Sequence, residues 1–230
     1  MPCGMTNKYF YAEPIAEPEN VIRHLAKQER HWRKGYSAYE LTHSWVEAKG
    51  IPGPVAAVLH QAEEFRGVEL IEGFFEKETD LRTPGRPSQT DLLALVGDDS
   101  DFAVLGVEGK VDEPFGPLVA EWLQDASANK KARLSVLRET LGLANRGVLH
   151  LRYQLLHRTA VTIYEARRYR VRRAVMVVHS FSESHRWFDD FQEFAGAVDA
   201  PVSNPNELSS NVTAEGVSLR LAWVADKASP

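Results

Sequence analysis

Three ionisable residues could do chemistry together, although they are distant along the chain. Asp91 begins one apolar stretch, and Glu108 and Lys110 end a second. Side chains alternate along a strand, so Glu108 and Lys110 share one face. If the two stretches form a hairpin with Gly97 opposite Phe102, Asp91 lies opposite Glu108 and on the same face. The spacing therefore predicts that two carboxylates and one ammonium group meet at a common corner of a sheet.

Such a group is costly in strands that are apolar on both faces. Two carboxylates about 4 Å apart repel by roughly 4 kcal/mol at an effective dielectric constant of about 20, and a buried ion is costly unless it is paired. A divalent cation relieves the repulsion, and Mg²⁺ commonly takes one or two carboxylates together with water and phosphate oxygens. The lysine would orient or activate a water, or stabilise charge on phosphorus. The pattern predicts phosphodiester cleavage, and an ion-pair network at a sheet edge remains the alternative.

The same residues resemble a known signature. Asp91 followed by Glu108-Gly109-Lys110 resembles the Asp…Glu-x-Lys motif of the PD-(D/E)XK nuclease superfamily, which has the restriction-endonuclease-like fold. Residues 86–91 and 107–116 also resemble an uncharacterised bacterial family within that superfamily. Pro87 departs from the motif, because it stands four residues before Asp91 rather than next to it. The resemblance implies Mg²⁺ or Mn²⁺ as cofactor and nucleic acid, usually DNA, as substrate.

The resemblance also implies roles for individual residues. Asp91 and Glu108 would bind the metal, and Lys110 would be the catalytic lysine. A helical acid often assists in the superfamily, and Glu64 is the match that we expect here. Gln154 falls where members often place a polar residue that faces the site. Substrate contacts are expected from four neighbouring positions, namely Ser88, Gln89, His157 and Arg158.

A second Glu-x-Lys triplet, Glu47-Ala48-Lys49, provides an internal comparison. It falls on a predicted helix, where residues two apart do not face each other. We therefore interpret it as a solvated turn of helix, and we expect only the copy at Glu108 to be functional.

A serine hydrolase is a competing hypothesis from another class. The stretch 179–185 supplies three serines and two histidines, but it lacks the G-x-S-x-G nucleophile elbow. We interpret it as a strand end and its loop. The third hypothesis keeps the nuclease fold without the chemistry, which would leave a module that binds nucleic acid or protein.

Hydrophobic periodicity and turn residues predict the elements around these positions. Helices are predicted at 21–34, 37–49, 55–65, 118–126, 132–141, 153–169 and 187–198, and extended segments at 68–81, 91–97, 102–111, 174–179 and 217–224. Ser37 is predicted to cap its helix, with Glu40 completing a capping box. The order predicts an α/β fold whose sheet begins antiparallel and continues parallel. With the resemblance, we expect an N-terminal helical extension (1–54) and a nuclease-like domain (55–230) with an αβββαβ core.

Charge and cysteine content limit which partners and which cellular compartment we expect for the protein. The net charge of the 230 residues is −5, yet the stretch 152–173 carries seven arginines and one acidic residue, so we expect this basic segment to help hold phosphates. A single cysteine, Cys3, allows no internal disulfide. No apolar stretch is long enough to cross a membrane, and the first residues lack the apolar core of a secretory signal. We expect a cytoplasmic protein without a membrane partner, and its oligomeric state is left open.

Overall fold

The computed structural model describes residues 13–25, 32–83 and 85–228, and Cys3 lies outside them. The described residues form an α/β structure around one mixed sheet of six strands. The strands are β1 (Glu69–Thr79), β2 (Ser88–Gly97), β3 (Phe102–Lys110), β4 (Arg173–Ser180), β5 (Val212–Ala214) and β6 (Val217–Ala225). The α-helices are α2 (Ser37–Ala48), α3 (Gly53–Leu59), α4 (Val119–Trp122), α5 (Ala128–Thr140), α6 (Tyr153–Tyr169) and α7 (Phe188–Ala197), and two 3₁₀-helices are η1 (Pro18–His24) and η2 (Glu63–Phe65).

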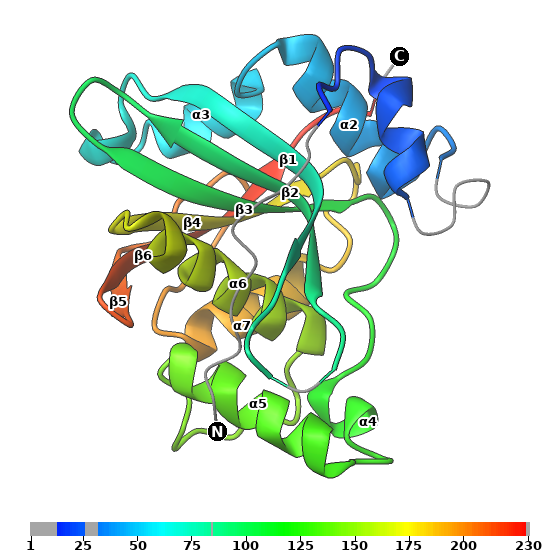
Figure 1. The fold of residues 1–230 in the computed structure, drawn as a ribbon, viewed down its shortest axis with the longest axis vertical. Helices are drawn as coiled ribbons and strands as arrows, with labels where there is room; N and C mark the ends of the chain where they lie inside the picture. Colours follow the sequence, from blue (N-terminus) through cyan, green and yellow to red (C-terminus); the bar gives the residue numbers. More distant parts are fainter. Residues whose placement is uncertain (1–12, 26–31, 84, 229–230) are drawn as a thin grey trace.

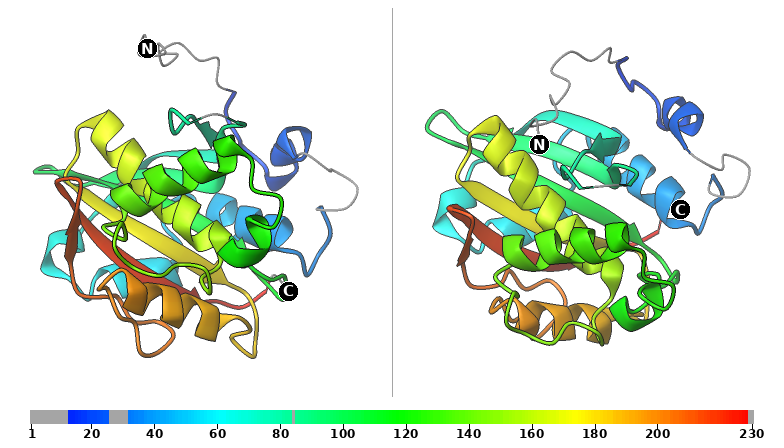
Figure 2. Two further views of the ribbon diagram at one scale, coloured as in Figure 1. Left: turned by 90° about the horizontal axis from the view of Figure 1, so that it is seen from below. Right: turned by 60° about the horizontal axis from the view of Figure 1, so that its bottom comes forward.

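The sheet has the strand order β1-β2-β3-β4-β6-β5. The first three strands are antiparallel neighbours, whereas β4 lies parallel to β3 and β6 lies parallel to β4. This confirms the expected antiparallel start and parallel continuation, with α6 as the crossover between β3 and β4. Figure 2 shows β1 and β2 at one edge of the sheet, and β5 and β6 at the other.

Helices cover both faces of the sheet (Figure 1). α2 and α3 lie on one face, where Trp45 and Val58 pack in one apolar cluster with Leu105 of β3. α5, α6 and α7 lie on the other, where Leu155 and Phe191 belong to a second cluster. Because β2, β3 and β4 are covered on both faces, their central residues are apolar, and any charged group near their ends must find a partner. α2 falls in the segment predicted as an extension, yet it packs against the sheet directly.

Two glycines let the helices approach β3 closely. A Cβ at Gly106 would lie 1.9 Å from Thr162 Oγ1 of α6, and a Cβ at Gly109 would lie 3.1 Å from Leu41 Cβ of α2. Gly109 is the middle residue of the strand-borne Glu-x-Lys triplet. Its lack of a side chain therefore brings α2 against the back of the strand that carries Glu108 and Lys110.

The hairpin register and the long crossover helix agree with the sequence prediction. Gly97 pairs with Phe102 and Leu92 with Val107, where the paired register ends, and its continuation by one residue sets Asp91 opposite Glu108. α6 has the predicted bounds.

Three predictions about helices were wrong or incomplete. The helix predicted at 21–34 is a 3₁₀-helix that ends at His24, and residues 26–31 lie outside the described residues. The 55–65 helix ends at Leu59. Ser37 does not cap α2, because its backbone N–H donates to Glu113 Oε1 at 2.9 Å, so a distant carboxylate caps the helix. Among the described helices, none combines the length and apolar character needed to cross a membrane.

Candidate functional site

A polar cavity of about 360 Å³ opens where β1, β2 and β3 meet α2 and the N-terminal turns of α6. It brings together six of the nine residues that the sequence singled out. The cavity is lined by Gln89, Asp91, Glu108, Lys110, Gln154 and Arg158, together with Leu25, Tyr36, Ser37, Ala38, Glu76 and Glu113.

Glu108 is the most heavily bonded carboxylate of this cavity. Its Oε1 atom accepts hydrogen bonds from Lys110 Nζ at 2.8 Å and from Gln154 Nε2 at 2.5 Å. Its Oε2 atom is paired with Arg158 Nε. Burial alone would raise the pKa of Glu108, but the charges of Arg158 and Lys110 outweigh it and lower the pKa to about 2. Glu108 is therefore ionised throughout the neutral range.

Asp91 lies beside Glu108 but has fewer partners. Its Oδ2 atom accepts a hydrogen bond from the backbone N–H of Gly109 at 3.0 Å, and its Oδ1 atom from Arg158 Nη2 at 3.2 Å. Burial and the negative charge of Glu108 raise the pKa of Asp91 to about 6. The two acids thus repel each other, as the sequence predicts, and the guanidinium of Arg158 bridges them.

Lys110 is held by the same network. Its ammonium group donates to Glu108 Oε1 and, at 3.2 Å, to Gln154 Oε1, and it lies 5.0 Å from the centre of the Phe115 ring. Only 5% of its side chain is exposed. Gln154 therefore bonds both members of the ion pair and fixes the direction of the lysine.

Glu76 is a cavity residue that the sequence reasoning missed. It lies in β1 between Phe75, which pairs with Leu92, and Lys77, which pairs with Thr90, so it is opposite Asp91. Its backbone has a φ of 52°, a left-handed conformation that costs about 1–2 kcal/mol for a residue with a Cβ. Burial and the charge of Asp91 raise the pKa of Glu76 to about 8. No sequence pattern signals a left-handed residue in a strand.

Glu64 does not reach the cavity, and its predicted role is wrong for that reason. The helix that was expected to carry it ends at Leu59, and Glu64 lies in η2. Its Oε1 atom accepts hydrogen bonds from Arg220 Nε at 2.9 Å and Nη2 at 2.7 Å, and its carbonyl accepts one from Arg173. Arg173 begins β4, whereas Glu108 is opposite Val178 near the end of that strand. Glu64 is therefore at the opposite end of the sheet.

Ser88 and His157 lie beside the cavity without lining it. Ser88 Oγ and His157 Nδ1 are 2.7 Å apart. Burial, with the nearby charge of Arg158, lowers the pKa of His157 well below its ordinary value. The imidazole is therefore neutral, and it supports the end of β2 rather than offering a positive charge to a substrate.

The basic segment 152–173 is not one free surface. Arg158 bridges the cavity acids, and four other arginines pair with carboxylates elsewhere, namely Arg152 with Asp190, Arg167 with Glu215, Arg168 with Glu165 and Arg173 with Asp101. Five of the seven arginines are thus already neutralised, so the positive charge available for phosphates is smaller than the sequence suggests.

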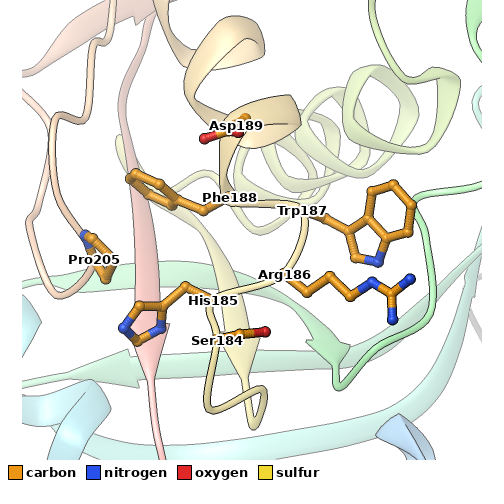
Figure 3. Close-up of a pocket in the computed structure, with 7 residues that line it drawn as sticks. All are labelled: Ser184, His185, Arg186, Trp187, Phe188, Asp189 and Pro205. Atoms are coloured by element: carbon orange, nitrogen blue, oxygen red, sulfur yellow. The ribbon is translucent and has the colours of Figure 1, made fainter.

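A second cavity, of about 560 Å³, lies beyond β4 and holds part of the Ser/His stretch (Figure 3). In Figure 3 His185 extends toward Pro205, whereas Arg186 and Trp187 extend to the other side. Ser182 Oγ donates to Asp112 Oδ1 at 3.0 Å rather than to a histidine. Within the stretch 179–185, Ser182 is therefore not placed as a nucleophile with a histidine base.

The donor set of the first cavity suits a cation held by two carboxylates, with water and substrate oxygens completing its shell. Among the described residues, no three His, Cys, Asp or Glu side chains are gathered closely enough to hold a metal ion by themselves. Asp91 and Glu108 would supply the protein ligands, and the guanidinium of Arg158 would have to give way between them.

Comparison with known proteins gives a family but no activity. The family described as "Domain of unknown function (DUF6946)" matches residues 14–228. No curated protein and no solved structure matches the chain.

Proposed function

The chain belongs to the DUF6946 family, a domain of unknown function, and we propose from the first cavity that it is a metal-dependent nuclease. The observation that carries the proposal is the meeting of Asp91, Glu108 and Lys110 in one cavity, from two strands, in the register that the sequence predicts. The element order of one helix, three strands, a crossover helix and a fourth strand supports a restriction-endonuclease-like core. DNA is the substrate that we propose first, and the cytoplasm is the expected compartment.

The chain's own groups have distinct tasks in this proposal. Asp91 and Glu108 would hold Mg²⁺ or Mn²⁺, which would supply charge stabilisation at the phosphate and a lowered pKa for a bound water. Lys110 orients the attacking water, because its ammonium group lies 2.8 Å from Glu108 Oε1. Gln154 keeps the lysine and the glutamate in place. Arg158 moves from the acids to the phosphate oxygens of the substrate, for which a guanidinium is well shaped.

The test is a panel of single-stranded and duplex DNA and RNA, incubated with EDTA, Mg²⁺ or Mn²⁺. We expect cleavage only with a divalent cation. Lys110→Ala should reduce cleavage by a factor of about 10² to 10⁴. Lys49→Ala is the matched control, since Lys49 ends the other Glu-x-Lys triplet on an exposed helix end. Cleavage in EDTA, or full activity of Lys110→Ala, would refute the proposal.

One observation favours a second function, a binding module without catalysis. The charges of Lys110 and Arg158 already offset both carboxylates without a metal, and Gln154 adds a hydrogen bond to Glu108. A network whose acids are already paired within the protein is what a degenerate site would keep. Tight binding of a nucleic acid with no turnover under any divalent cation would support this second function over the first.

A further inference from the structure

The polar cavity has an aromatic side chain in its lining in addition to its ionisable groups. Tyr36, which directly precedes α2, lines the cavity, and 41% of the residue is exposed. Of the large apolar residues that are exposed in the described part of the chain, only Tyr36 borders this cavity. With the described residues, its ring forms no aromatic or cation–π contact and its hydroxyl group forms no hydrogen bond. The ring of Tyr36 is therefore available to a ligand.

An amide of the lining is also without a partner. Gln89 stands two residues before Asp91 in β2, so the two side chains lie on the same face, and both line the cavity. Among the described residues, none forms a hydrogen bond with the side-chain amide of Gln89, although the residue is half-buried. Gln154, the other amide of the lining, donates to Glu108 and accepts from Lys110. A half-buried amide that faces a cavity loses hydrogen bonds to water unless a ligand replaces them.

The fold holds the ring and the amide on two different elements around one space. Tyr36 is fixed at the start of α2, because the backbone N–H of Ser37 is bonded to Glu113 and the helix packs against Gly109 of β3. Gln89 is fixed by β2, the antiparallel neighbour of β3. The cavity volume of about 360 Å³ falls in the range of about 300–1,000 Å³ that is usual for sites of small ligands. The cavity thus offers a flat ring for stacking and an amide that both donates and accepts hydrogen bonds.

We propose that the cavity receives an unpaired nucleobase of a nucleic-acid strand, which stacks on Tyr36 and forms hydrogen bonds with the side-chain amide of Gln89. The inference rests on the proposed function, since it takes nucleic acid as the substrate. Every base has a π face, and its edge carries donors and acceptors that an amide can match. In a duplex the neighbouring bases cover that face, so the strand binds single-stranded or with the base extruded. Because Gln89 is two residues from Asp91, the base lies next to the groups that are proposed to cleave the strand.

The experiment measures the binding of three fluorescein-labelled DNA probes to the full chain by fluorescence anisotropy, in EDTA so that no strand is cleaved. The first probe is a single strand of mixed sequence, the second is a single strand of the same length with abasic residues, and the third is the blunt duplex. We expect the wild type to bind the first probe at least about tenfold more tightly than the other two, because only this probe offers free bases for stacking.

The variants test the two residues separately. Tyr36→Ala should weaken binding of the normal single strand by a factor of about 10 or more and leave the affinity for the abasic strand unchanged. Tyr36→Phe should bind as the wild type does, because it keeps the ring. Gln89→Leu should weaken binding of the normal strand by a factor of about 3 to 10. Tyr169→Ala is the matched control, since Tyr169 is 39% exposed at the end of α6 and does not line the cavity.

The outcomes separate this proposal from the nuclease proposal. The base site is refuted if the wild type binds none of the probes, if it binds the normal and the abasic strand equally, or if Tyr36→Ala binds the normal strand as the wild type does. An equal loss of affinity in Tyr36→Ala and Tyr169→Ala also refutes it. In each of these cases the nuclease proposal still depends only on the cleavage panel. If the preference for free bases is found but no divalent cation supports cleavage, the base site stands and the nuclease proposal fails.

Discussion

Two polar networks lie back to back near the carboxyl ends of β3 and β4, and they differ in what they leave unsatisfied. The first, the cavity network, consists of Asp91, Glu108, Lys110, Gln154 and Arg158. The second, the histidine network, lies on the α2 side of the sheet, where His179 of β4 is opposite Gly109. Trp45 Nε1 donates to His179 Nδ1 at 3.2 Å, so His179 Nε2 donates to Asp226 Oδ2 at 3.0 Å.

The histidine network is closed. His179 is fully buried, both of its ring nitrogens are bonded, and Asp226 ties the segment after β6 to α2 through Ser44. The cavity network borders about 360 Å³ of space, which is also lined by Glu76. Networks that satisfy every group stabilise a fold, whereas a network of ionisable groups that borders an open cavity is suited to binding. The comparison therefore favours a structural role for the histidine network and a binding role for the cavity network.

The largest expected effect on stability comes from removing the guanidinium group of Arg158 from the cavity network. Arg158→Ala leaves Glu108 and Asp91 without their shared partner, and breaking a buried ion pair costs about 3–5 kcal/mol. The side chains of Arg158 and Glu108 are only 11% and 2% exposed, so solvent gives little compensation. The free energy of unfolding, measured by urea titration in EDTA, should fall by that amount.

Arg167→Ala is the control for this prediction. Arg167 belongs to the same helix and pairs with Glu215 at 2.7 Å, but its side chain is 53% exposed, so its loss should cost less than about 1 kcal/mol. Adding Mn²⁺ should restore part of the stability of Arg158→Ala, because a cation would then neutralise the same acids. Equal stability losses in the two variants would mean that the cavity network is no more buried than a surface pair.

A smaller effect is expected from the histidine network, and it depends on pH. Burial lowers the pKa of His179 below its ordinary value of 6.5, although Asp226 opposes the shift. Below pH 6.5 the unfolded chain therefore binds a proton more readily than the folded protein, and the free energy of unfolding decreases as the pH falls. His179→Phe removes this contribution, so its stability should fall less steeply than that of the wild type between pH 6.5 and 5.

The same variant should also be less stable at pH 8, by about 1–3 kcal/mol, because Trp45 and Asp226 lose a buried partner. His157 remains in the variant, and its lowered pKa acts in the same direction, so some slope should persist. Mn²⁺ affinity should not change. A His179→Phe protein that keeps the wild-type slope, or that loses Mn²⁺ binding, would contradict the division between the two networks.

The sequence predicted the part of the site that depends on local periodicity. Strand alternation and a four-residue turn were enough to place Asp91 opposite Glu108, because a shift by one residue would turn the apolar side chains of both strands to the wrong face. α6 was equally readable, and so the positions of Gln154 and Arg158 were expected. The general α/β class, with a mixed sheet and helices on both faces, followed from the order of these elements.

The rest of the site depends on contacts that no local pattern records. Glu76 lies in a strand whose alternation is irregular and whose left-handed residue is enforced by packing. Glu113 caps α2 from 76 residues away. The bonds of Arg158 to Glu108 and Asp91 were not foreseen either, because they depend on the distance between side chains from different elements. Contacts between charged residues that are distant in the sequence can be found only from the three-dimensional structure, whereas periodicity can be found from the sequence.

The smallest expected effect on stability and activity concerns Glu64, the acid that the predicted helix at 55–65 would have carried. The apolar periodicity of the sequence continues to Phe65, but the helix ends at Leu59. The carboxylate of Glu64 bonds Arg220 at the other end of the sheet. Arg220 and the backbone help to lower the pKa of Glu64, although burial opposes the shift, as in an ordinary surface ion pair. Glu64→Gln should therefore change the free energy of unfolding by less than about 1 kcal/mol. Its cleavage rate and Mn²⁺ affinity should stay within about twofold of the wild-type values, because a surface substitution typically changes a free energy by only about 0.5 kcal/mol. A large loss of cleavage or of Mn²⁺ binding in this variant would show that the two ends of the sheet are coupled, and the cavity could then no longer be treated as a self-contained site.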